Sequence, residues 1–206
     1  MDNEATTTRI DVLRHGEPEG GPMFRGSQDD PLSELGWQQM REAISPQDRW
    51  DAVITSPMLR CAPFAQYYAN QQQLPLYSDD RLREISFGRW EGQTAATIMA
   101  TEHEALSRFW RDPEQYPPPE GEPVTAFYQR VQQAWQHWTT ELAGQRLLMV
   151  CHGGVIRMIL AEVLGAPLGR AFSAIAVPYA CRSQIQIERS AYGVMSCLND
   201  HNPSRL

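Results

Sequence analysis

Two histidines in this chain stand directly before a glycine, each at the point where a short apolar run ends. His15 follows the run 9–13 and Arg14, and His152 follows the run 146–151. A neutral imidazole can attack phosphorus and form a covalent intermediate, and a second imidazole, if cationic, can hold the phosphoryl oxygens. Glycine after each histidine lets a ligand come close to the backbone. The pair therefore predicts phosphoryl transfer through a histidine.

Arginines near these histidines could supply the positive charge that a phosphoryl group needs. Arg14 precedes the first histidine, and Arg60 follows the β-prone run 51–55 and the dipeptide Ser56-Pro57. A planar guanidinium matches two phosphate oxygens at once, so Arg14 and Arg60 can act as a clamp. The leaving oxygen also needs a proton, which requires a carboxyl group nearby.

The elements that must position these residues alternate along the chain. Strands are predicted at 9–13, 51–55, 74–77, 146–151, near 175, at 185–187 and at 194–198. Helices are predicted from the cap Ser33 to 44, from Ser56-Pro57 to 68, and over 94–111, 123–142 and 155–164. This order predicts an α/β fold, a three-layer α/β/α sandwich around a mostly parallel sheet. The carboxyl ends of its strands would bring His15, Arg60 and His152 to one edge.

Composition restricts the class of protein. With 206 residues, 42% of them hydrophobic and 21% charged, the chain predicts one globular domain. A net charge of −7 argues against broad nucleic-acid binding. A polar N-terminus and the lack of a long apolar run predict a cytoplasmic protein without a membrane segment. The expected partner is a small-molecule phosphate ester, and the apolar tail strands could support a homodimer.

Five motifs, in order, resemble the histidine phosphatase superfamily, which includes the cofactor-dependent phosphoglycerate mutases. They are LRHGE at 13–17, SPMLRC at 56–61, LREISFGRWEG at 82–92, the segment 121–131, and CHGG at 151–154. The resemblance implies a single domain over 1–206 with a phosphoglycerate mutase-like fold. Residues 79–123 would form an active-site cap. It implies neither a metal nor another cofactor.

The resemblance also implies roles for matching positions. His15 would be the nucleophile and Glu84 the proton donor, although Glu17 or Glu91 could be mistaken for the acid. Four residues would bind the phosphoryl group, three by side chains and the last by its backbone N–H: Arg14, Arg60, His152 and Gly153. Arg25, on a mobile loop, would face the substrate. The alternatives are a solvated loop charge for Arg25 and a hydrogen-bonded core histidine for His152.

The sequences of three segments, 24–37, 56–65 and 82–92, resemble those of alpha-ribazole phosphatases. These enzymes remove the 5′-phosphate of alpha-ribazole in assembly of the lower loop of cobalamin. The favoured function is therefore a metal-independent phosphomonoesterase of this kind. One alternative is a broad small-molecule phosphatase or a phosphoglycerate mutase. Another is a non-catalytic phosphate-binding module. The chain departs from the superfamily pattern in its substrate loops, at Pro18, Gly20, Gly21 and Pro123.

Tryptophans give two further expectations. Trp135 and Trp138 lie on an apolar stripe of helical period and are predicted in the core. Trp90 and Trp110 could line a base-binding cleft, but packing is the favoured interpretation.

Overall fold

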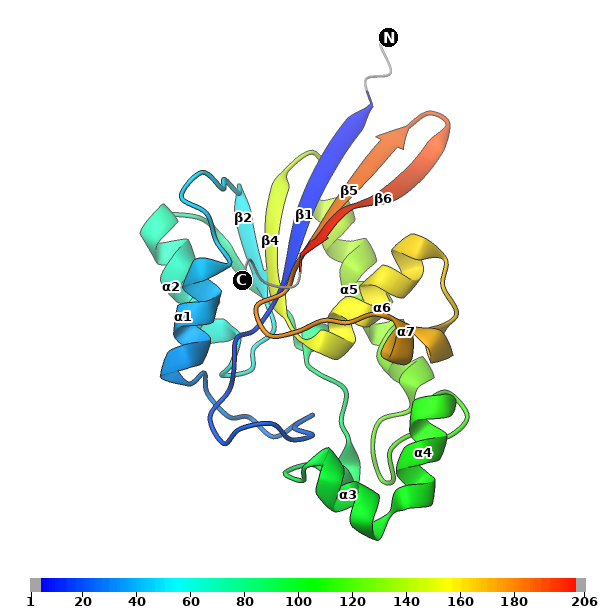
Figure 1. Ribbon diagram of the computed structural model, residues 1–206. Coiled ribbons are helices and arrows are strands. Elements are labelled where there is room, and N and C mark those ends of the chain that lie inside the picture. The colour runs from blue at the N-terminus through cyan, green and yellow to red at the C-terminus, as the bar shows by residue number, and fades with distance from the viewer. Residues whose placement is uncertain (1–4, 203–206) are drawn as a thin grey trace.

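A computed structural model describes residues 5–202, which contain a six-stranded sheet in the order β3-β2-β4-β1-β5-β6 (Figure 1). The strands are β1 (Thr6–Arg14), β2 (Ala52–Thr55), β3 (Leu76–Ser78), β4 (Arg146–Cys151), β5 (Arg182–Ser190) and β6 (Gly193–Asn202). The first four strands in space run parallel, while β5 is antiparallel to β1 and β6 to β5. The prediction of a mostly parallel sheet is confirmed.

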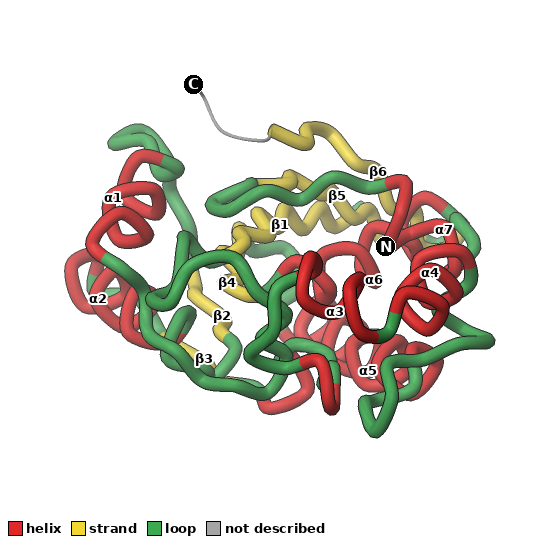
Figure 2. The backbone as a smooth tube through the Cα atoms, turned by 60° about the horizontal axis from the view of Figure 1, so that its bottom comes forward, coloured by secondary structure: helices red, strands yellow, loops and turns green. Residues whose placement is uncertain are grey.

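Helices cover both faces of the sheet (Figure 2). One face carries α1 (Glu34–Glu42) and α2 (Ala62–Gln72), and the other carries α5 (Val124–Glu141) and α6 (Gly153–Leu164), with α7 (Leu168–Ala174) against α6. Successive strand residues point to opposite faces. Val12 and Leu13 of β1 accordingly enter two different hydrophobic clusters, one on each side. The expected three-layer sandwich is confirmed.

The long helix α5 follows its sequence pattern closely. Its apolar stripe, which includes Val124, Phe127 and Val131, is buried against the sheet. Trp135 and Trp138 belong to the same buried cluster, which confirms their prediction as core residues. At α1, Ser33 accepts the Gly36 N–H at 3.0 Å and so caps the helix as predicted. Among residues 5–202, no helix is long and apolar enough to cross a membrane.

The segment between β3 and α5 differs from its prediction. The helix expected over 94–111 is two helices, α3 (Ala95–Thr101) and α4 (His103–Arg111). They meet at Glu102, whose backbone leaves the helical region and whose carboxylate accepts from the Trp90 indole and Arg89. The short helices η1 (Asp80–Leu82) and η2 (Gly88–Trp90) precede them. Tertiary contacts of Glu102 therefore override the helical pattern.

Two other element predictions are wrong. The helix expected from Ser56-Pro57 begins only at Ala62, because the Ser56 hydroxyl bonds His152 and the Cys61 N–H closes a tighter turn on the Met58 carbonyl. Arg60 therefore lies in the turn before α2. The strand expected near Ile175 is irregular backbone after α7, since the Ile175 carbonyl accepts from Arg157.

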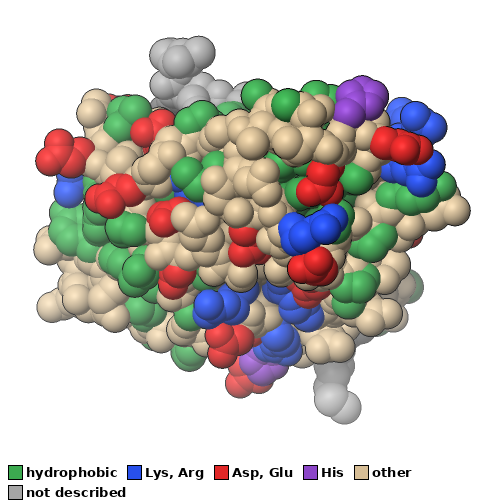
Figure 3. All heavy atoms as spheres, turned by 90° about the horizontal axis from the view of Figure 1, so that it is seen from below, with side chains coloured by type: hydrophobic (Ala, Val, Ile, Leu, Met, Phe, Trp, Pro, Cys, Tyr) green, Lys and Arg blue, Asp and Glu red, His purple; other side chains and the backbone are tan. Residues whose placement is uncertain are grey.

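The carboxyl ends of β1, β2 and β4 meet at one edge. Arg14 pairs in register with Cys151, and Thr55 with Val150. This edge is the lower end of the sheet in Figure 1, and α3 and α4 lie beneath it. Seen from that side, acidic and basic side chains are mixed over the surface (Figure 3). The next residues along the chain, His15, Ser56 and His152, are thereby brought together.

Candidate active site

His15 leaves β1 with its ring fixed by its own backbone. Its N–H bonds the Cys151 carbonyl at 2.9 Å, and its Nδ1 lies 2.7 Å from the Gly16 carbonyl oxygen. A carbonyl only accepts, so Nδ1 carries the proton and Nε2 keeps a free lone pair. Burial, and then the charges of Arg14 and Arg60, hold the pKa of His15 well below its ordinary value. The ring is therefore neutral near pH 7.

Arg14 is a half-buried cation with spare donors. Its Nη1 donates to the Val177 carbonyl at 2.5 Å, and its guanidinium lies 4.3 Å from the centre of the Tyr179 ring. Its Nε is buried without a partner in the part of the chain that the structure describes. A buried unpaired donor costs about 1–3 kcal/mol. Arg14 is thus suited to an oxygen of a bound ligand.

Arg60 is held at three points while it borders the same cavity. Its Nε donates to Nδ1 of His152 at 3.2 Å, its Nη1 to the Gln28 carbonyl at 2.7 Å, and its Nη2 to the Gly26 carbonyl at 2.8 Å. Only 1% of the residue is exposed. Each Nη atom carries a second hydrogen, so Arg60 can still donate to a ligand.

His152 lies beside His15, with the two ring centroids 5.2 Å apart. Its Nε2 lies 2.7 Å from the Ser56 hydroxyl, and its Nδ1 accepts from Arg60. Burial, followed by the nearby Arg60, lowers its pKa well below the ordinary histidine value. Unlike His15, it does not border the cavity. The cationic second imidazole considered from the sequence is therefore disfavoured, and its direct contact with a phosphoryl group stays a prediction.

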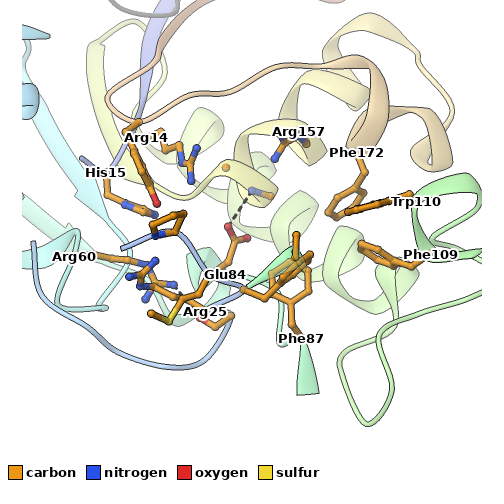
Figure 4. A pocket seen from close by; sticks show the side chains of 18 residues that line it. Arg14, His15, Arg25, Arg60, Glu84, Phe87, Phe109, Trp110, Arg157 and Phe172 are labelled. Carbon is orange, nitrogen blue, oxygen red and sulfur yellow. Dashed lines mark hydrogen bonds between the residues drawn. The ribbon is translucent and has the colours of Figure 1, made fainter. Parts of the chain in front are cut away.

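Glu84 is the carboxylate of the site. Its Oε2 accepts the Gly154 N–H and its Oε1 the Ile85 N–H, both at 3.1 Å. Figure 4 shows this carboxylate pointing into the cavity. The two alternative acids lie elsewhere: Glu17 and Glu91 are not among the residues that line it. The geometry favours Glu84 as the acid, and its role stays a prediction.

Arg25 is expected on a mobile loop that faces the substrate, and its contact with the substrate stays a prediction. Although it borders the cavity, it is buried, and its Nε bonds Asp30 at 2.9 Å. Its Nη2 donates to the carbonyls of Glu19 and Gly21, at 2.5 and 2.6 Å. These bonds fold the loop around its guanidinium. Arg25 therefore holds the loop, a role that no pattern in the sequence indicates.

The cavity has a volume of about 400 Å³ and two chemically different ends. Arg14, His15 and Arg60 lie at one end, with Glu84 between them and a wall of aromatic rings (Figure 4). The wall comprises Phe87, Phe109, Trp110 and Phe172. Gly153 borders the polar end from the first turn of α6, where its N–H has no acceptor within the helix. A phosphate with an apolar substituent matches this arrangement.

Sequence reasoning missed part of this lining. Arg157 borders the cavity, donates from Nε to the Ile175 carbonyl at 3.0 Å and has no acidic partner among residues 5–202. It follows Gly153 by four residues, one helical turn, and that spacing could have identified it. Trp110 is 44% exposed and borders the cavity, so its packing interpretation is wrong, whereas fully buried Trp90 packs as predicted. No cluster of three or more metal-ligating side chains occurs in the described residues.

Similarity to known proteins extends over most of the chain. The model of the histidine phosphatase superfamily (branch 1) matches residues 10–200. The chain is 27% identical over 195 residues to the adenosylcobalamin/alpha-ribazole phosphatase of Escherichia coli K12, covering 93% of this chain and 95% of that protein. It is 32% identical over 169 residues to the bifunctional protein Rv2228c of Mycobacterium tuberculosis, covering 80% of this chain. The chain spans about half (46%) of the length of that mycobacterial relative.

A solved structure supports the fold. The mycobacterial glucosyl-3-phosphoglycerate phosphatase Rv2419c superposes with a TM-score of 0.84, covering 98% of this chain and all of that one, at 24% identity. At this identity the likeness concerns the fold alone. Together with the match over residues 10–200, it confirms the resemblance inferred from the five motifs. The chain belongs to the histidine phosphatase superfamily, branch 1.

Proposed function

We propose that this protein hydrolyses phosphate monoesters through a phosphohistidine formed on His15. The observation that carries the proposal is the hydrogen bond from Nδ1 of His15 to the Gly16 carbonyl. It leaves the Nε2 lone pair free on a neutral ring, beside the guanidinium groups of Arg14 and Arg60. A neutral nucleophile next to two cations is suited to attack a phosphate dianion.

The first half of the reaction transfers the phosphoryl group to the enzyme. Arg14, Arg60 and the Gly153 N–H would hold its nonbridging oxygens. Nε2 of His15 forms a bond to phosphorus as the bond from phosphorus to the leaving oxygen breaks. Protonated Glu84 gives its proton to that oxygen, so the alcohol leaves neutral.

The second half returns the enzyme to its starting state. Glu84, now a carboxylate, takes a proton from a water molecule that attacks phosphorus opposite Nε2. The bond from phosphorus to nitrogen breaks and inorganic phosphate leaves. His152 would act on the phosphoryl group through Arg60, because Nδ1 of His152 accepts a hydrogen bond from Nε of Arg60 at 3.2 Å.

The aromatic end of the cavity supports a leaving group with a planar ring. Phe109, Trp110 and Phe172 come from two helices and face the cavity beyond Glu84 (Figure 4). Aromatic side chains stack on flat rings and bury large apolar areas. Alpha-ribazole 5′-phosphate carries a planar benzimidazole base, and the name of the Escherichia coli relative includes alpha-ribazole phosphatase. We favour it as the substrate, within assembly of the lower loop of cobalamin.

A second substrate class is favoured by Arg157. Its guanidinium borders the cavity near Glu84 and has no acidic partner in the described residues. A carboxylate on the leaving group could pair with it, as in phosphoserine or 3-phosphoglycerate. Relatives named for such substrates include a glucosyl-3-phosphoglycerate phosphatase that is 28% identical over 172 residues.

The test is phosphate release, without added metal, from a panel of esters. It would hold alpha-ribazole 5′-phosphate, phosphoserine, 3-phosphoglycerate, a nucleotide and p-nitrophenyl phosphate. We expect the highest kcat/KM for alpha-ribazole 5′-phosphate and no turnover by His15→Ala. Isomerisation of 3-phosphoglycerate instead of hydrolysis would support a mutase. If no ester is turned over, a phosphate-binding module becomes the better description.

Three sequence predictions accompany this proposal and stay predictions: a cytoplasmic location, a homodimer, and an active-site cap over residues 79–123 in a single domain. For the cap, the relevant observation is that Phe87, Ala95, Phe109 and Trp110 reach the cavity from that stretch.

A further inference from the structure

One carboxylate outside the cavity, that of Glu91, joins two segments that both carry residues of the site. Its Oε1 accepts the backbone N–H groups of Ser27 and Phe87, at 2.9 and 2.8 Å, and the Ser86 hydroxyl at 3.0 Å. Its Oε2 accepts the Ser27 hydroxyl at 2.6 Å. Hydrogen bonds to a carboxylate are stronger than those between neutral groups. Glu91 therefore fixes Ser27 against the segment that follows Glu84.

The backbone carbonyls of the two residues that flank Ser27 hold Arg60. The Gly26 carbonyl accepts from Nη2 and the Gln28 carbonyl from Nη1, at 2.8 and 2.7 Å. The position of Ser27 thus decides where both Nη groups of Arg60 lie. Hydrogen bonds therefore connect Glu91 with Arg60 through the segment 26–28.

Close packing shows that the loop lies directly on the segment 85–93. Gly26 has a φ of +52°, and a Cβ there would come within 2.2 Å of Glu91 Oε1 and 2.7 Å of the Ile85 carbonyl oxygen. Only glycine fits this approach. Beside it, Phe24 exchanges backbone bonds with two residues of the segment, donating to the Gln93 carbonyl at 2.9 Å and accepting from Gly92 at 2.8 Å.

We propose that Glu91 is a positioning residue for the phosphoryl site, which acts by holding the loop 24–28 so that Arg60 points at the phosphoryl group. This inference rests on the proposed function only where it assigns Arg60 to that group. Glu91 does not border the cavity, and its four accepted hydrogen bonds occupy both carboxylate oxygens. Its part in the reaction is therefore exerted through the loop and not by proton transfer.

Two substitutions separate positioning from proton transfer. In Glu91→Gln the amide oxygen can accept the donors of Oε1, and the amide N–H can donate to the Ser27 hydroxyl. In Glu91→Ala all four bonds are lost. We expect Glu91→Ala to lower kcat/KM for p-nitrophenyl phosphate about tenfold to hundredfold. KM and the inhibition constant of inorganic phosphate should both rise in Glu91→Ala, while kcat changes little. Both constants should stay close to the wild-type values in Glu91→Gln.

A matched control and a milder variant complete the series. Glu102 is a carboxylate of the same part of the chain, bonded to Arg89 and Trp90, with no hydrogen bond to residues 24–28. Glu102→Ala should leave phosphate inhibition unchanged. If Glu91→Ala does not fold, Ser27→Ala removes only the hydroxyl bond and should weaken phosphate inhibition in the same direction, by less.

Amide hydrogen exchange gives a readout that does not depend on turnover. Glu91→Ala should lose protection at Ser27 and Phe87 together with weaker binding of inorganic phosphate. Lost protection with unchanged phosphate binding would overturn the proposal, as would a Glu91→Gln variant as impaired as Glu91→Ala. If the wild type hydrolyses no ester, the proposed function fails. Exchange and phosphate binding would still decide the positioning role.

Discussion

The Nε of Arg60 lies 3.2 Å from Nδ1 of His152, inside the protein. An arginine can only donate, so this Nδ1 carries no proton and the ring proton lies on Nε2, facing the Ser56 hydroxyl at 2.7 Å. A second proton on His152 would turn an N–H toward the guanidinium and break the bond. The placement of Arg60 is therefore coupled to the neutral state of His152.

Substitutions of His152 should follow this geometry. An Asn side chain at 152 can place its amide oxygen near the position of Nδ1 and accept from Arg60, whereas Ala cannot. We expect His152→Ala to raise the inhibition constant of inorganic phosphate about tenfold or more, which is at least ~1.4 kcal/mol. His152→Asn should raise it less. If the inhibition constant of inorganic phosphate rises equally in both variants, phosphate binding does not depend on the hydrogen bond that His152 accepts from Arg60.

Stability should fall on the acid side of neutrality because of the two buried histidines. Burial, with the neighbouring arginines, lowers the pKa of both His15 and His152. The unfolded chain binds a proton at each near pH 6.5, while the folded state does not. The free energy of unfolding therefore loses nothing to these histidines above that pH. Below it, the free energy of unfolding decreases by up to ~1.4 kcal/mol per pH unit for each histidine.

Urea unfolding of the wild type and of His15→Ala, at pH values from 7.5 to 5.5, measures how the free energy of unfolding decreases with falling pH. The variant should show a shallower decrease, by about one proton. His103→Ala, at an exposed histidine, is the control and should keep the wild-type slope. Parallel curves for the wild type and His15→Ala would mean that His15 accepts a proton in the folded protein.

The role of Glu84 can be separated from binding by the choice of leaving group. Protonation matters for an alkoxide and little for p-nitrophenolate, which leaves readily without a proton. Glu84→Gln should therefore slow hydrolysis of alpha-ribazole 5′-phosphate about 10²-fold to 10⁴-fold, and p-nitrophenyl phosphate far less. Equal losses on the two esters would remove Glu84 from the acid role.

The glycines after His152 should tolerate change unequally. A Cβ on Gly154 would lie 2.3 Å from Oε1 of Glu84, whereas the nearest atoms to one on Gly153, in Arg14 and Arg157, would lie at 3.3 Å. Gly154→Ala should displace the carboxylate and lower kcat/KM about tenfold to hundredfold. Gly153→Ala keeps its N–H and should lose less. The measurement is kcat/KM of the two variants on esters of ordinary alcohols, whose leaving groups need a proton. A larger decrease of kcat/KM in Gly153→Ala than in Gly154→Ala would contradict the geometry.

The sequence is sufficient to predict the placement of site residues that directly follow the end of a strand. The positions of His15, Arg60 and His152 at one sheet edge follow from the chain direction of parallel strands, and the order of motifs added Glu84. It could not give the partners of Arg25 or Glu91, because those bonds join loops whose paths depend on tertiary packing. The prediction that Trp110 packs in the core is wrong for the same reason. Only the packing of α4 decides whether its ring is buried or faces a cavity.

Substrate choice should be divided between the aromatic wall and Arg157. A ring that stacks on Trp110 or Phe172 gains about 0.5–1.5 kcal/mol beyond its buried area, and a charge-assisted bond to Arg157 gains about 1.5–3 kcal/mol. Trp110→Ala should therefore lower kcat/KM for alpha-ribazole 5′-phosphate about tenfold and barely affect phosphoserine. Arg157→Ala should do the reverse.

The matched control for the aromatic wall is Arg111→Ala, an exposed neighbour on α4 that does not border the cavity. The same ester panel, measured for all three variants, gives the ratio of kcat/KM between the two substrates. Opposite shifts of that ratio in Trp110→Ala and Arg157→Ala would assign separate parts of the leaving group to the two side chains. A common loss on every ester would instead place both in the support of the phosphoryl site, and the leaving-group assignment would be wrong.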